Sequence, residues 1–174
     1  YGETYNGMQM LDKHQFPDGV DPYREKGNPE SGLLWGIMKG DMGKTGEGDK
    51  RVQAYNFRIT MTNDPHNRIP ITRPENYDST RYELLVRWKE TDPWRSDKLR
   101  DCFAWDLMTN PTKTDINNNQ AFSTDMIGYS WDYPEASYKQ RERIFKEHLD
   151  YTKGLLWFMA SDPRVPAFVR RQIG

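Results

Sequence analysis

The stretch Asp132 to Ser161, DYPEASYKQRERIFKEHLDYTKGLLWFMAS, decides the fold of this chain. Apolar side chains and one histidine recur along it at helical spacing: Ile144, His148, Tyr151, Leu155 and Phe158. A stripe with this period is typical of a helix that packs one face against a core. The sequence therefore predicts a long helix near the carboxyl end of the chain.

The two ends of this helix have signals of their own. Asp132, followed three residues later by Glu135, resembles a capping box, and Pro134 falls in the first turn, where its missing N–H costs nothing. Asp162-Pro163 predicts the end of the helix. We therefore expect the helix to span the whole quoted stretch.

The stretch Val52 to Pro65, VQAYNFRITMTNDP, predicts a strand that runs to Thr62, because its side chains alternate between two faces. One face is mainly aromatic and aliphatic and carries Gln53, Tyr55, Phe57, Ile59 and Met61. The other face is more polar and carries Val52, Ala54, Asn56, Arg58 and Thr60. Such a strand packs its apolar face on a core.

Three further elements are expected: a helix from Asp78 or Ser79 to about Glu90, a strand from Cys102 to Met108, and a short helix that begins near Pro166 and carries Arg170 and Arg171. Residues 1–50 hold many Gly and Pro residues and predict loops and turns. The fold class that follows is α+β, with a small mixed or antiparallel sheet packed by one long C-terminal helix and a long irregular N-terminal region. We expect a single domain over residues 1–174: loop-rich over 1–50, strands plus one helix over 51–131, and helical over 132–174.

Composition limits the function. Only 35% of the 174 residues are hydrophobic and the mean hydropathy is -1.00, but 10 Tyr, 7 Phe and 6 Trp supply apolar area for a core. A formal net charge of -1 argues against nucleic acid as a partner. No apolar run approaches the roughly 20 residues that span a bilayer, so no membrane span is expected in this chain.

Metal and nucleotide sites are not expected either. The single cysteine excludes an internal disulfide, and the three histidines are too far apart in sequence to suggest a metal site. Gly43-Lys44-Thr45 resembles the end of a phosphate-binding loop, but Met38 stands where the first glycine of that loop belongs. No GxGxxG follows a predicted strand, so this chain alone is not expected to bind FAD or NAD.

Asn56 and Arg58 are the first candidate site residues. They are two positions apart on a predicted strand, so their side chains point to the same side. A guanidinium beside an amide suits a carboxylate, a carbonyl or the edge of a flavin ring. The alternative is structural: Arg58 pairs with an acid across the sheet, and Asn56 satisfies the hydrogen-bonding groups of a loop.

Lys113, Asp115 and Asn117 are the second set of candidates, within KTDINNN. We expect this stretch to follow a strand and a turn, where open sheets commonly bind ligands, with Asp125 and Tyr129 extending the site. Asparagine runs also form plain turns. No catalytic residue can be assigned, and His148 is expected to be a helix-face residue rather than a base.

Tryptophan side chains in or near predicted loops allow a different function. Trp94, Trp105 and Trp131 offer flat rings that could stack on sugars, whereas packing in an aromatic-rich core is the alternative. A carbohydrate-binding or polysaccharide-processing module therefore stays open at this point. A structural insertion without catalytic function is a further alternative.

Several stretches together resemble the FAD-dependent oxidoreductase family of large bacterial flavoproteins, some of which are labelled xanthan lyase. The stretches are YGETYNGMQ, FPDGVDPYR, VQAYNFRITMTNDPHNRIPITRPENYDSTRYELL, KTDINNNQAFSTDMIG and DYPEASYKQRERIFKEHLDYTKGLLWFMASDPRVP. They cover most of the chain. In the family, a Rossmann-type FAD-binding segment precedes this region and a further FAD-contacting segment follows it.

The resemblance implies that this chain is an excised interior fragment, the substrate-side region of a longer protein. It implies FAD in the intact parent and none bound to this fragment alone. The partners are then the flanking FAD-binding segments and a small-molecule or carbohydrate substrate. The implied reaction is hydride transfer from substrate to flavin.

Overall fold

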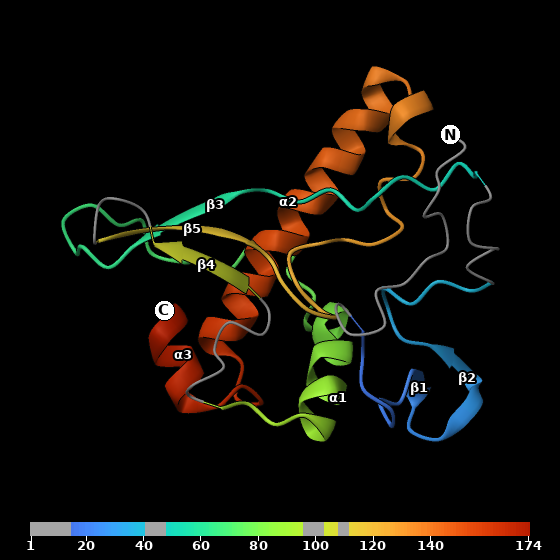
Figure 1. The fold of residues 1–174 in the computed structure, drawn as a ribbon, viewed down its shortest axis with the longest axis horizontal. Helices are drawn as coiled ribbons and strands as arrows, with labels where there is room; N and C mark the ends of the chain where they lie inside the picture. Colours follow the sequence, from blue (N-terminus) through green and yellow to red (C-terminus); the bar gives the residue numbers. More distant parts are fainter. Residues whose placement is uncertain (1–14, 41–47, 96–102, 108–111) are drawn as a thin grey trace.

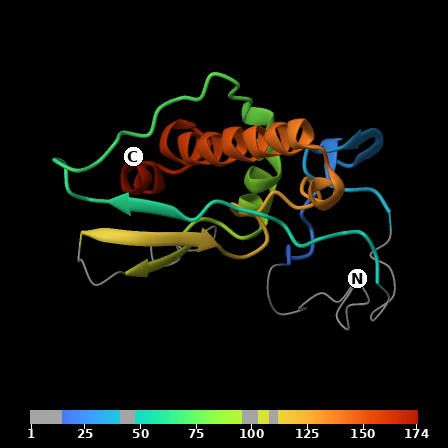
Figure 2. The same ribbon diagram turned by 90° about the horizontal axis from the view of Figure 1, so that it is seen from above.

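The computed structural model describes residues 15–40, 48–95, 103–107 and 112–174, and its centre is a three-stranded antiparallel sheet beneath a long helix (Figures 1 and 2). The strands are β3 (Ile59–Thr62), β4 (Phe103–Leu107) and β5 (Lys113–Asn118), in the order β3-β5-β4. Helix α2 (Tyr138–Ser161) lies along one side of this sheet (Figure 2). The α+β prediction is confirmed, and the sheet is antiparallel.

The face of the sheet that packs on the core is set by strand alternation. Ile59 of β3 pairs in register with Ile116 of β5, and Ile116 and Phe103 are completely buried. Side chains one position away along the same strands point to the opposite face. Arg58, directly before β3, and Asp115 in β5 belong to that second, polar face.

The strand predicted from Val52 to Thr62 is shorter than expected. Only Ile59–Thr62 pairs with β5, and the pairing stops at Ile59 with Ile116 although β5 continues to Asn118. The preceding residues remain without strand pairing. Side chains, rather than a backbone ladder, hold that part of the chain.

The core is built mainly on α2, and its predicted stripe is confirmed, since all five side chains are buried. The predicted start of the helix is wrong. Asp132 makes no capping hydrogen bond and precedes only a short 3-10 turn, η3 (Tyr133–Glu135). The helix begins at Tyr138 because Ser137 and Gln140 form a reciprocal capping box, in which each side chain bonds the other's backbone N–H.

The second helical segment matches its prediction. Asp78 caps a 3-10 turn, η1 (Ser79–Tyr82), by accepting a hydrogen bond from the Thr80 N–H, and α1 (Glu83–Thr91) continues from it. The Tyr82 hydroxyl, which is buried, donates to the Tyr151 carbonyl of α2 at 2.9 Å. This bond and the packed rings around it join the two helical segments.

The N-terminal region contains a hairpin that the sequence did not indicate. Strands β1 (Tyr23–Glu25) and β2 (Asn28–Leu33) pair antiparallel through a turn at Gly27, whose φ is 73°. Buried Arg87 of α1 binds the Asp21 carboxylate that flanks this hairpin. The hairpin is therefore attached to α1, away from the three-stranded sheet (Figure 1).

The chain closes with α3 (Ala167–Ile173), which follows Pro166 as expected. Val169 and Ile173 of this helix are buried in the common core. In the described part of the chain, no helix has the length and apolar character needed to cross a membrane.

Candidate functional site

An open polar recess lies where the unpaired chain before β3 meets the end of β5. Its volume is about 520 Å³. The lining residues are Gln53, Ala54, Tyr55, Asn56, Arg58, Asn117, Asn118 and Asp125. Three of the five predicted site residues are thus brought to one place: Asn56, Arg58 and Asn117.

Asn56 is the central residue of the recess. Its side-chain nitrogen, Nδ2, donates to Asn117 Oδ1 at 3.0 Å and to Asp125 Oδ1 at 2.9 Å. Both amide hydrogens are therefore used, and the carbonyl oxygen of this side chain is oriented by them. The two bonds also hold the chain before β3 against β5, through Asn117, and against the segment that follows β5, through Asp125.

Asp125 reaches the recess because the chain turns back after β5. The turn includes Gln120, which has a φ of 59°. The Asp125 carboxylate then accepts from Asn56 through one oxygen and from Asn118 Nδ2 through the other, at 2.6 Å. One carboxylate thus fixes two amide side chains, each of which keeps further hydrogen-bonding capacity.

Arg58 and Asp115 form a two-point ion pair on the polar face of the sheet. The guanidinium Nε lies 3.3 Å from Asp115 Oδ1, and its Nη2 contacts the other oxygen. Arg58 therefore has the structural role that was its alternative assignment, because it pairs with an acid across the sheet. The Arg58 side chain is still 55% exposed and lines the recess, so it can meet a solute.

The segment KTDINNN follows β4 along the chain and forms a strand itself, so the expectation that its charged pair lies just outside a strand end is wrong. Residues Lys113–Asn118 form β5, the middle strand of the sheet, in which Thr114, Asp115 and Ile116 are paired with both neighbouring strands. Lys113 lies at the opposite end of β5 from the recess, in register with Thr62, and does not line it. Asp115 acts on the recess only through Arg58.

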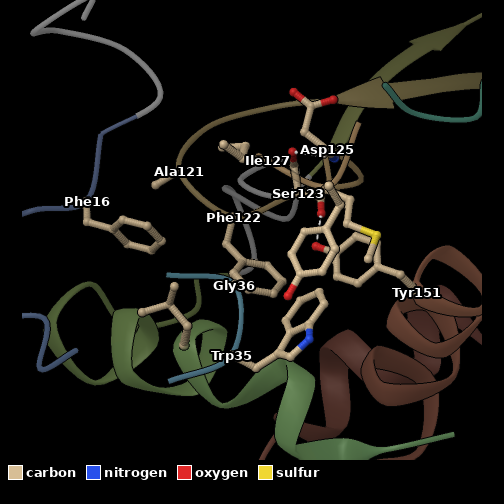
Figure 3. A pocket seen from close by; sticks show the side chains of 12 residues that line it. Phe16, Trp35, Gly36, Ala121, Phe122, Ser123, Asp125, Ile127 and Tyr151 are labelled. Atoms are coloured by element: carbon tan, nitrogen blue, oxygen red, sulfur yellow. Dashed lines mark hydrogen bonds between the residues drawn. The ribbon is translucent and has the colours of Figure 1, made fainter. Parts of the chain in front are cut away.

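Tyr129 lies in a separate pocket of about 60 Å³, shown in Figure 3. Its ring stacks on Trp35 with 5.0 Å between centroids, and burial raises the pKa of its hydroxyl. Across this pocket the Tyr151 hydroxyl donates to the Ser123 carbonyl at 2.6 Å. These contacts are those of a packed aromatic cluster, and Tyr129 does not extend the polar recess.

Sequence reasoning missed four recess residues: Gln53, Ala54, Tyr55 and Asn118. Alternation places Gln53 on the apolar face of the predicted strand from Val52 to Thr62. The observed strand begins only at Ile59, so alternation does not apply to Gln53. Asn118 follows Asn117 directly, and alternation would put it on the other face, but the strand ends there and both side chains reach the recess. The only sequence signal for Asn118 as a site residue was its place within the asparagine run.

No described helix begins in a turn suited to a dinucleotide pyrophosphate. Both sheets are antiparallel, so the described residues contain no strand-turn-helix unit of the Rossmann kind. The amino end of α2 is already satisfied by its capping box. Gly43-Lys44-Thr45, the stretch that resembles a phosphate-binding loop, lies outside the described residues, as do His14 and Cys102.

Comparison with known proteins agrees with the sequence resemblance. The model of the FAD dependent oxidoreductase family matches residues 3–172, nearly the whole chain. No curated protein matches, and no solved structure matches. Since the family match covers well over half of the sequence, this chain belongs to the FAD-dependent oxidoreductase family.

Proposed function

We propose that the chain is the substrate-side domain of an FAD-dependent oxidoreductase and that the polar recess orients the substrate. The FAD is held mainly by flanking segments of a longer protein. Flavins of this enzyme class take a hydride from the substrate, and the protein supplies binding and orientation. The part of that task assigned to this chain is orientation.

The recess carries the proposal. It gathers amides, a carboxylate and an exposed guanidinium from two separate stretches of the chain. Amide and carboxylate groups bind hydroxyls, and a guanidinium binds carboxylates or carbonyls at two points. The ligand that fits is therefore a small hydroxylated or carboxylated molecule.

The family implies FAD, but the described residues do not fit its pyrophosphate. They offer neither the glycine turn nor the free helix end that would hold one. The amides and Arg58 of the recess suit only the edge of a ring or a substrate. This pattern supports placing the dinucleotide-binding part on other segments of the parent protein.

The carbohydrate-binding alternative has weaker support. The Trp94 ring packs against the core, with Lys89 Nζ 5.1 Å from its centroid. The Trp131 ring is half-buried and lies beneath the Arg51 guanidinium at 5.8 Å. Neither ring is a free stacking platform; for Trp105, only the backbone is described.

Flavin content tests the proposal. The longer protein, purified without added cofactor, is expected to be yellow and to release FAD on denaturation. The 174-residue chain alone, shown to be helical by circular dichroism, is expected to take up no FAD on dialysis. A colourless parent protein with no flavin contradicts the proposal, as does stoichiometric FAD binding by the chain alone.

Tryptophan fluorescence separates the alternative. Acidic polysaccharides titrated into the chain should cause no saturable change if the recess, rather than a tryptophan platform, is the ligand site. A saturable quench would favour the carbohydrate-binding module.

A further inference from the structure

A second pocket, of about 130 Å³, lies between the chain before β3 and the start of α2. Four aromatic side chains line it, Tyr55, Phe57, Tyr133 and Phe145, together with Asn56, Ile144 and His148. Apolar cavities of about 150 Å³ accept a benzene-sized ligand. The pocket therefore has room for one six-membered ring.

The rings around the pocket are arranged to receive another ring. Tyr55 meets Tyr133 edge to face at 5.6 Å, and Phe57 meets Phe145 edge to face at 5.2 Å. Tyr55 remains 37% exposed and Phe145 52% exposed, although both are large apolar side chains. Exposed aromatic surface beside a pocket commonly marks a site of interaction.

His148 adds a second polar side chain, besides Asn56, to this mainly apolar lining. Its Nδ1 lies 2.8 Å from the Ile144 carbonyl, which can only accept, so Nδ1 carries the hydrogen. In the neutral ring, Nε2 is then an acceptor. His148 is only 5% exposed, and its buried Nε2 has no hydrogen-bond partner among the described residues, so a ligand in the pocket reaches it when a lining side chain moves aside. Buried polar atoms are rarely left in this state, so a donor is missing here.

We infer that this pocket binds a phenolic ring, whose hydroxyl donates a hydrogen bond to His148 Nε2 while the aromatic side chains enclose the ring. An aliphatic alcohol would satisfy the nitrogen but would forgo the edge-to-face contacts. An unsubstituted ring would make those contacts but would leave the nitrogen without a donor. Of these three ligand classes, only the hydroxylated aromatic ring satisfies both.

This inference goes beyond the proposed function, because it concerns a separate pocket and is tested by binding. The pocket and the polar recess share Tyr55 and Asn56 in their walls. They differ in character, one enclosed by rings and the other by amides and charges. Failure of either assignment leaves the other intact.

The test compares phenol with benzene as probes. The chain contains three histidines, so the nitrogen resonances of His148 can be assigned by NMR from variants. Phenol should shift the Nε2 resonance of His148 saturably, and benzene should shift the pocket side chains while leaving that nitrogen nearly unchanged. An Nε2 resonance indifferent to phenol overturns the inference.

Two replacements of His148 isolate the acceptor. In His148→Asn, the amide nitrogen can keep the bond to the Ile144 carbonyl, but no acceptor stands at the Nε2 position. The preference for phenol over benzene should fall about fivefold relative to the wild type, the effect of one hydrogen bond. His148→Gln, which can place an amide oxygen near that position, should retain more of the preference.

His66→Asn, a change at an exposed histidine, is the matched control and should leave the preference unchanged. An Asn variant of His148 that keeps the full preference also contradicts the inference. If that variant does not fold, the NMR titration of the wild type decides alone.

Discussion

At the scale of single residues, Gly154 is fixed by contact with Tyr82. A Cβ atom at this position of α2 would lie 2.1 Å from the Tyr82 hydroxyl oxygen, which is buried and bonded to the Tyr151 carbonyl. The Tyr82 side chain cannot move away without losing that hydrogen bond. Glycine is therefore required here by packing, against the normal preference of a helix interior for alanine.

Gly154→Ala should lower the free energy of unfolding by about 1–3 kcal/mol, the usual cost of overpacking a core. Helix propensity alone would raise it by about 1 kcal/mol, so the two effects have opposite signs. Chemical denaturation measures the difference, and Lys153→Ala, at the exposed neighbouring position, should change it by less than about 0.5 kcal/mol. A Gly154→Ala variant more stable than the wild type would show that the tyrosine ring moves freely.

Asn56 is the residue that holds the recess together. Asn56→Asp keeps its size but places a second carboxylate beside Asp125, at a contact that is 2.9 Å in the wild type. We expect a loss of about 2 kcal/mol at neutral pH, since a half-buried donor is replaced by a like charge.

The pH dependence has a definite sign in that variant. Repulsion raises the pKa values of the facing carboxylates, so the penalty is present at neutral pH and is relieved as the pH falls through those raised values. Asn76→Asp is the matched control, because Asn76 also donates to a carboxylate, Asp150, but at an exposed site. Equal losses in the two variants, or no relief in acid, would contradict the role of Asn56.

At the scale of elements, the start of α2 is the clearest difference between sequence and structure. Both Asp132 with Glu135 and Ser137 with Gln140 fit the spacing of a capping box. The second pair forms the box because the chain makes a 3-10 turn after Asp132 and is extended at Ala136. Spacing alone could not choose between two adjacent candidates.

Ser137→Ala should lower the free energy of unfolding by about 1 kcal/mol, the usual effect of losing an N-cap. Asp132→Ala should change it by less than about 0.5 kcal/mol, since Asp132 makes no capping bond. Thermal or chemical denaturation of both variants measures the comparison. A larger loss in the Asp132 variant would restore the start predicted from sequence.

The end of α2 is joined to α1 through charge. Arg164 binds Asp162 at 2.9 Å and Glu83 of α1 at 2.9 Å, and its guanidinium lies over the Phe158 ring. The hydrogen bond from the Arg164 side chain is the main cause that lowers the pKa of Asp162 below 3.8. The charged form of this carboxylate is therefore favoured in the folded protein.

A carboxylate whose pKa is lowered by folding stabilises the protein above its unfolded value, and that stability is lost as the pH falls through the folded value. Asp162→Asn should thus be less stable than the wild type at neutral pH and should lose less stability in acid, below about pH 4. Glu142→Gln, at an exposed position of α2, should keep the wild-type acid profile. Parallel profiles for the wild type and Asp162→Asn would contradict this linkage.

Other elements followed from the sequence to differing degrees. The stripe of α2 and the Asp78 cap were predictable, because periodicity and capping are local properties. The hairpin β1-β2 was not, since its strands contain Gly, Pro and charged residues and are stabilised by contacts with α1 such as Lys26 with Glu90. Long-range contacts of this kind leave no local signal.

The candidate site shows the same limit. Alternation put Asn56 and Arg58 on one side, and both line the recess, but the paired strand begins only at Ile59. The asparagine run was as compatible with a plain turn as with a binding site. Its pairing as the middle strand depends on the whole sheet and not on the local sequence. Only the fold could bring Asp125 to Asn56.

At the scale of the whole molecule, the chain combines a stable helical core with a polar sheet face. Helices α2 and α3 lie on one side of the three-stranded sheet (Figure 2). The recess lies at the end of the sheet and is assembled by side-chain hydrogen bonds rather than by backbone pairing. An orienting role needs such a preformed set of polar groups.

Substrate-driven reduction of the flavin in the longer protein tests this role most directly. Hydroxylated and carboxylated small molecules are screened anaerobically for loss of the yellow colour. The rate is then measured for Arg58→Ala and for Arg143→Ala, an arginine at an exposed position of α2 that lies outside the recess. Arg58→Ala should slow reduction about tenfold or more, with unchanged FAD content and fold, while Arg143→Ala reacts as the wild type does. A wild-type rate in Arg58→Ala would contradict the assignment of the recess as the substrate site.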